Sequence, residues 1–86
     1  MKLIIQVPCY NEAEHIAHTL GLLPRQLEGV DQVEVLVIDD GSSDASVQAA
    51  RAGGADHIVR LPHHTGLAGA FAAGLDACVR LGADLI

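Results

Sequence analysis

Apolar residues along the chain gather in four short runs, separated by longer stretches in which they recur at helical spacing. The runs cover residues 3–7, 33–38, 57–61 and 83–86. β-branched residues are frequent in them, and Pro8 and Pro62 follow the first and the third, which predicts strands. The second run holds four consecutive apolar residues, 35–38, as expected of a parallel strand covered on both faces.

The segment after the first run predicts a helix that begins at Asn11 and ends near Leu23. Asn11 has a side chain suited to an N-cap, and Glu12 and Glu14 would then lie in the first turn, where acids interact favourably with the helix dipole. Pro24 is expected to end or kink this helix, because proline has no N–H to donate.

Two further helices are expected. One uses Ser42 or Ser43 as its N-cap and runs to about Ala52, before two glycines. The other covers residues 67–81 and carries an apolar stripe typical of a helix packed against a core. The stripe consists of Leu67, Phe71, Leu75, Cys78 and Val79.

These elements predict one small α/β domain over residues 1–86, in the order β-α-β-α-β-α-β. Strands that alternate with helices favour a parallel sheet with right-handed crossovers, a Rossmann-like arrangement. Because the last apolar run stops at Ile86, we interpret the chain as truncated at its C-terminal end.

Charge and composition exclude several function classes. The formal net charge is −6, and the five basic residues are scattered, so neither nucleic acid nor an anionic lipid surface is an expected partner. No stretch approaches a signal peptide or the ~20 apolar residues of a membrane helix. Cys9 and Cys78 could pair, but they fit no zinc or redox spacing, and we interpret them as reduced thiols of a cytosolic protein.

Three unusual loops follow the predicted strands, at residues 8–12, 39–44 and 63–66. In open α/β sheets ligands bind beyond the carboxyl ends of the strands, and parallel topology puts all three loops at that edge. In the first loop, Tyr10 could stack on a planar base or simply pack across the sheet edge. Glu12 could accept hydrogen bonds from a ligand or serve only as a first-turn acid.

The second loop, Asp-Asp-Gly-Ser-Ser-Asp, has a more specific signal. Adjacent acids at a strand end repel each other, and a carboxylate there can accept hydrogen bonds from a nucleobase or a ribose. A simple turn with an N-cap would explain one acid better than it explains both Asp39 and Asp40. Asp44 is expected to be structural and to accept local backbone hydrogen bonds.

The third loop leads into a glycine-rich helix start at residues 66–70. Free N–H groups there favour an anion such as a diphosphate, although glycines also permit tight helix–sheet packing. His63 and His64 are expected to be solvent-exposed loop residues, because adjacent side chains seldom bind one metal ion.

Taken together, residues 8–12, 37–44 and 66–77 resemble the start of an inverting family 2 glycosyltransferase, closest to the dolichol-phosphate mannose synthase-like enzymes. The resemblance covers essentially the whole chain and implies the nucleotide-binding N-terminal half of a GT-A fold. It implies that Asp40 reads the base and that Asp39 supports the loop. The residues it assigns to nucleotide-sugar binding are Pro8, Tyr10, Asn11, Glu12, Ile38, Asp39, Asp40 and Gly66.

The resemblance also implies parts that lie beyond Ile86. These are the Asp-x-Asp ligands for Mg²⁺ or Mn²⁺, the catalytic base and any membrane contact, so no catalytic or metal-binding residue is assigned here, and the fragment alone is expected to be inactive. The donor could be GDP-mannose, UDP-glucose or UDP-N-acetylglucosamine, and the acceptor a polyprenyl phosphate. The full-length enzyme would then work in the cytoplasm, at the inner face of the membrane.

Three other interpretations compete with this one. A dinucleotide-binding domain needs Gly-x-Gly-x-x-Gly after the first strand, where this chain has residues 8–12. A receiver-like domain needs its acidic pair after the first strand rather than the second. A non-catalytic nucleotide-binding remnant of the same fold stays open.

Overall fold

The computed structural model describes all residues from Met1 to Ile86. Strands and helices alternate along the chain, which confirms the predicted α/β class. Their bounds are β1 Lys2–Cys9, α1 Ile16–Gly21, β2 Gln32–Asp39, α2 Ser46–Ala52, β3 His57–Arg60 and α3 Leu67–Arg80.

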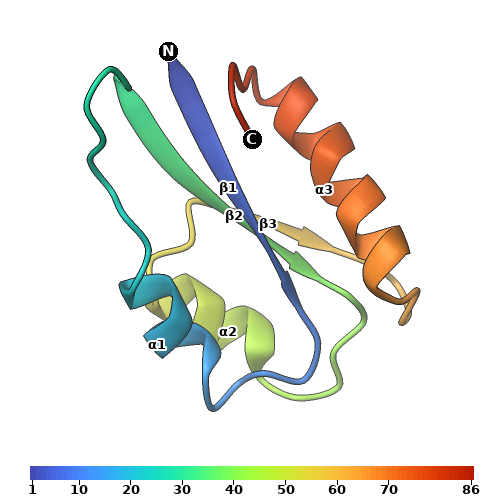
Figure 1. The fold of residues 1–86 in the computed structure, drawn as a ribbon. Helices are drawn as coiled ribbons and strands as arrows, with labels where there is room; N and C mark the ends of the chain where they lie inside the picture. The colour runs from blue at the N-terminus through green and yellow to red at the C-terminus, as the bar shows by residue number, and fades with distance from the viewer.

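The three strands form one parallel sheet in the order β1-β2-β3. β1 and β2 pair along their whole length, from Lys2 opposite Gln32 to Cys9 opposite Asp39. In Figure 1, α1 and α2 lie together on one side of the sheet and α3 lies on the other. All three strands therefore end at the same edge, which we call the carboxyl rim.

The predicted fourth strand is present only as a single bridge. Leu85 pairs in parallel with Leu3, and its carbonyl accepts a hydrogen bond of 3.0 Å from the N–H of Ile4. The last residues thus lie on the edge of β1 that β2 does not occupy.

The prediction that Pro8 ends the first strand is wrong, because β1 continues to Cys9. The carbonyl of Cys9 faces β2 and accepts the N–H of Asp40 at 2.8 Å. Successive backbone groups along a strand point to opposite sides, so the nitrogen of Pro8 faces the free edge of β1. Proline is tolerated there because no ladder hydrogen bond is lost.

Two hydrophobic clusters cover the two faces of the sheet. Alternate residues of β2 enter different clusters, as the two-residue period of a strand requires. On the α1/α2 face the buried members are Cys9, Ile16, Leu20, Val35, Val37 and Ala50. On the α3 face they are Ile4, Leu36, Ile38, Ala70 and Cys78. The two cysteines lie in different clusters and are free thiols, as predicted.

The prediction for the buried side of α3 is largely wrong. The residues that face the sheet are the small ones, Ala70, Gly74 and Cys78, whereas Leu67 and Phe71 are 73% and 55% exposed. The reason is close packing: a Cβ on Gly74 would come within 1.8 Å of the Gln6 side chain. Large residues do not fit between α3 and the sheet, so they occupy its flank.

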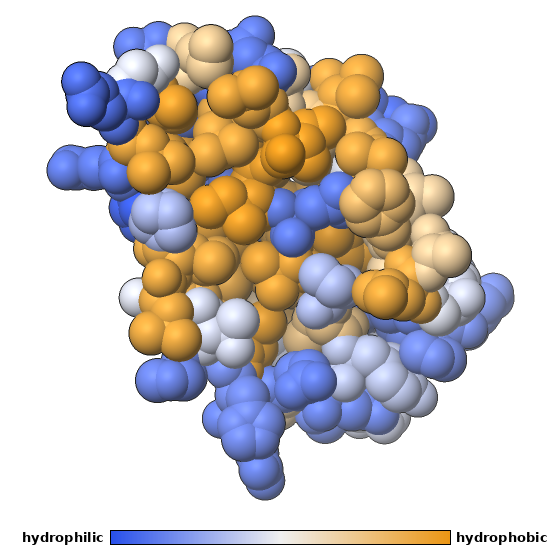
Figure 2. Space-filling view, in the orientation of Figure 1, coloured by the Kyte–Doolittle hydropathy of each residue, from blue (hydrophilic) through white to orange (hydrophobic).

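The space-filling view shows where these apolar side chains gather. In Figure 2 a broad apolar area extends over the face that carries β1, and hydrophilic residues collect toward the bottom of the view. Phe71, Leu75 and Ile86 line a hollow there together with Leu3 and Ile5 of β1.

Both predicted N-caps are wrong. α1 begins at Ile16 and α2 at Ser46, and neither has a side-chain cap. Asn11 instead adopts a left-handed conformation with φ of 52°, and Glu12 and Glu14 precede α1. α1 also ends at Gly21, two residues before Leu23. None of the helices combines the length and the hydropathy needed to cross a bilayer.

Candidate functional site

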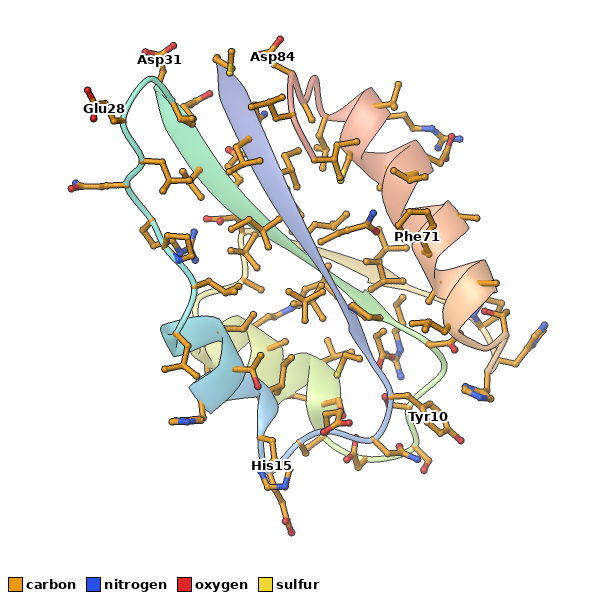
Figure 3. All side chains as sticks on the ribbon, viewed as in Figure 1. Tyr10, His15, Glu28, Asp31, Phe71 and Asp84 are labelled. Atoms are coloured by element: carbon orange, nitrogen blue, oxygen red, sulfur yellow. The ribbon has the colours of Figure 1, made fainter.

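The three loops meet at the carboxyl rim, as the parallel order predicted. Backbone hydrogen bonds join the strand ends, from Asp40 N–H to the Cys9 carbonyl at 2.8 Å and from Leu61 N–H to the Asp39 carbonyl at 2.9 Å. In Figure 3, Tyr10 marks this rim, and Asp31 and Asp84 lie at the opposite end of the sheet.

The first and second loops are joined by neutral hydrogen bonds. The N–H of Asn11 donates to Ser42 Oγ, and Asn11 Oδ1 accepts the N–H of Ser43, both at 2.9 Å. The N–H of Glu12 donates to Ser46 Oγ at 2.9 Å. Asn11 is thus a structural link between loops, which explains its left-handed backbone: asparagine adopts this conformation more readily than most residues.

Asp44 completes this junction and is structural, as predicted. Its Oδ1 accepts the N–H of Ser46 at 3.0 Å and also the Ser46 hydroxyl. Its Oδ2 accepts the N–H of Ala13 at 3.2 Å. The hydroxyl of Ser46, aided by these backbone donors, holds the pKa of the Asp44 carboxyl below its usual value.

Asp40 joins the second loop to the third. Its Oδ1 accepts the N–H and the hydroxyl of Thr65, at 2.8 and 2.7 Å, and its Oδ2 accepts the N–H of Gly66 at 2.9 Å. His64 Nδ1 lies 3.0 Å from the same Oδ2. Burial alone would raise the pKa of Asp40, but the hydrogen bonds from Thr65 and Gly66 outweigh it and lower the pKa.

Asp39 differs sharply from its neighbour. It is 1% exposed, and neither carboxylate oxygen has a hydrogen-bond partner. The nearest cation is Arg60, whose Nε lies 4.0 Å from Asp39 Oδ2. Side chains alternate along β2, and Asp39 therefore points to the α1/α2 face while Asp40 points to the α3 face.

Tyr10 is paired with His64. Their ring centroids are 3.9 Å apart with the planes inclined by 31°, so the two rings are in direct contact. Tyr10 is 44% exposed, and the His64 side chain is 50% exposed. Both rings therefore border solvent at the rim.

A pocket of about 250 Å³ opens between the first and third loops. Four of the predicted residues line it: Pro8, Tyr10, Glu12 and Asp40. The other four predicted residues do not line it. Asn11 links the loops, Ile38 is buried under α3, Asp39 faces α1 and α2, and Gly66 N–H is held by Asp40.

Four residues that line the pocket were not predicted as binding residues from the sequence. They are Cys9, His64, Leu67 and Ala70. From the sequence, His64 was expected to be only an exposed loop residue. The signal that could have found it is its place directly after β3, at the same rim as Tyr10 and Asp40.

No three His, Cys, Asp or Glu side chains come close enough together to hold an ion. Asp84 accepts the N–H of Lys2 at 2.7 Å, at the end of the sheet away from the rim.

The sequence was compared with protein families and with known proteins. Residues 4–80 match the family described as Glycosyl transferase family 2. The chain belongs to this family.

Named relatives include an undecaprenyl-phosphate mannosyltransferase of Micrococcus luteus, 32% identical over 90 residues, which cover 100% of this chain and 36% of that protein. A validoxylamine A glucosyltransferase of Streptomyces hygroscopicus is 41% identical over 57% of this chain and 12% of its own length. Glycosyltransferase AglE of Haloferax volcanii is 42% identical over 52% of this chain and 15% of its own. The chain thus spans about a third of the first relative and less of the others. No solved structure matches it.

Proposed function

We propose that this chain is the nucleoside-binding part of a glycosyltransferase that uses a nucleotide-sugar donor. The observation that carries the proposal is the rim pocket, where an exposed ring, a free carboxylate and a buried carboxylate lie together as Tyr10, Glu12 and Asp40. A ring can stack on a base, and carboxylates accept hydrogen bonds from base N–H groups and ribose hydroxyls.

Glu12 is the carboxylate best suited to a ligand. Its backbone is fixed, because its N–H donates to Ser46 and its carbonyl accepts the N–H groups of His15 and Ile16. Its side chain is exposed, lines the pocket and makes no hydrogen bond or ion pair. A fixed backbone with an unoccupied carboxylate is a preorganised acceptor for a ribose hydroxyl.

The names of relatives support a donor sugar and an acceptor. The Micrococcus luteus relative is named for undecaprenyl phosphate and mannosyl transfer, which supports a polyprenyl phosphate acceptor and a mannosyl donor such as GDP-mannose. The Streptomyces hygroscopicus relative is named for glucosyl transfer, which supports a glucosyl donor such as UDP-glucose. We further propose transfer with inversion, by direct attack of the acceptor on the anomeric carbon.

The catalytic base and a site for Mg²⁺ or Mn²⁺ are assigned to residues outside this chain. A bound cation of this kind would neutralise charge on the leaving diphosphate. The chain by itself is therefore expected to bind nucleotide without turning it over.

Calorimetric titration with GDP and UDP tests the proposal. Glu12→Gln should weaken nucleoside diphosphate binding about tenfold, because a hydrogen bond to a charged acceptor is lost. Glu14→Gln is the matched control, since Glu14 is exposed in the same segment and does not line the pocket. Equal effects of both substitutions, or absence of binding by the unmodified chain and by every variant, would contradict the proposal.

A further inference from the structure

From the geometry of the rim we infer that the imidazole of His64 occupies the nucleobase position, and that a nucleotide must displace it to bind. The inference rests on the proposed function and concerns the same pocket. His64 makes two contacts there, one with the ring of Tyr10 and one with the carboxylate of Asp40.

The contact of His64 with the Tyr10 ring is one that a stacked nucleobase would make. A base that stacks on Tyr10 needs its plane about one ring thickness from the tyrosine ring. The His64 centroid already lies 3.9 Å from that of Tyr10. No base fits between the two rings at this distance, so the face of Tyr10 that contacts His64 is closed to a base while His64 stays in place.

The contact of His64 with Asp40 also resembles one that a nucleobase would make. His64 Nδ1 lies 3.0 Å from Asp40 Oδ2 and 3.3 Å from the Asp40 carbonyl oxygen. Both of these oxygens are acceptors, so Nδ1 carries the proton and donates it. An N–H of a planar ring that donates to Asp40 is also the contact by which a nucleobase would be recognised.

Asp40 has three other donors. Two of them are the backbone N–H groups of Thr65 and Gly66, and the third is the Thr65 hydroxyl. A carboxylate has about four acceptor positions, and these three donors together with His64 fill them. The two backbone donors are fixed by the loop, whereas His64 can yield its position by a side-chain rotation, because its side chain is half-exposed.

Removing the ring should therefore tighten binding. In His64→Ala, GDP or UDP should bind about tenfold more tightly than in the unmodified chain, as expected when a closed form that dominates about ten to one is abolished. His63→Ala is the matched control: this neighbouring histidine lies outside the pocket lining, and its substitution should leave affinity unchanged. If His64→Ala does not fold, His64→Gln, which also lacks the ring, replaces it in the same titration.

Tyr10 gives an independent readout, because it is the only tyrosine in the chain. Its ring signals in proton NMR should shift in His64→Ala without any nucleotide, since the shielding from the imidazole ring is lost. Adding GDP to the unmodified chain should move the signals of both rings together.

The outcomes separate the two proposals. If no variant binds any nucleoside diphosphate, the proposed function fails, and the displacement fails with it. If the unmodified chain binds nucleotide while His64→Ala binds it equally or more weakly, the proposed function stands and the displacement is wrong. Tighter binding by His64→Ala and not by His63→Ala supports the displacement.

Discussion

At the carboxyl rim, the two faces of the sheet each bury an aspartate, but only one of the two aspartates is hydrogen-bonded. On the α3 face, Asp40 is 3% exposed and receives hydrogen bonds from the third loop. On the α1/α2 face, Asp39 is 1% exposed and has no hydrogen bond at all. The two adjacent acids are thus separate chemical units: Asp40 builds the pocket, and Asp39 is buried with only a long ion pair to Arg60.

This difference depends on how closely the second and third loops approach. Gly41 has a φ of 76°, and a Cβ at this position would lie 2.5 Å from the backbone of His63 and His64. Gly41→Ala combines left-handed strain with a backbone clash and should cost at least about 3 kcal/mol of the free energy of unfolding. Urea denaturation measures this loss.

Gly29 is the matched control for that measurement. Its φ of 80° is nearly the same, but a Cβ at this position would meet no atom within 4 Å. Gly29→Ala should therefore cost only the left-handed strain, about 1–2 kcal/mol. Equal losses in the two variants would show that the loops do not approach this closely.

A smaller effect is expected from the two acids themselves. Asp40→Asn replaces one acceptor oxygen by a donor that faces other donors, and it should lower the urea midpoint. Asp39→Asn removes a buried charge that has no hydrogen bond and only a long ion pair with the exposed Arg60, and it should leave the midpoint unchanged or raise it. A loss in Asp39→Asn as large as that in Asp40→Asn would mean that Asp39 is stabilised by a partner in solution.

The smallest effect is expected in the pH dependence. The pKa of Asp40 is lowered from 3.8 in the folded chain. Its contribution to stability is therefore present above about pH 4 and is lost as the pH falls through the folded value. Asp40→Asn should show a shallower loss of stability in acid than the unmodified chain.

Asp44 and Asp56 also have lowered pKa values, so the acid response in Asp40→Asn should be reduced and not abolished. Urea titrations between about pH 2 and pH 5 would measure it. An unchanged slope in Asp40→Asn would contradict the assignment of this stabilisation to Asp40.

Much of the fold was predictable because it depends on local pattern. Continuous apolar runs such as 35–38 identify buried strands, and their alternation with helical spacing leaves few topologies other than a parallel sheet. The meeting of the three loops at one rim follows from that topology. The starts of α1 and α2 were predicted wrongly, because Asn11 and Ser42 bond to each other across 31 positions of sequence and cap no helix. The start of α3 at Leu67 was predicted correctly.

The sequence alone determined the alternation of strands and helices, the rim and the residue classes gathered there, since periodicity and strand direction are local properties. Tertiary structure decided the rest. The close approach at Gly74 turned the small face of α3 inward, and the packing of helices and loops on the two faces decided that Asp39 lies toward α1 and α2 while Asp40 meets the third loop. The contact of His64 with Tyr10 joins residues from two loops 54 positions apart, and no local pattern encodes such a distance, because it depends on how separately formed elements pack.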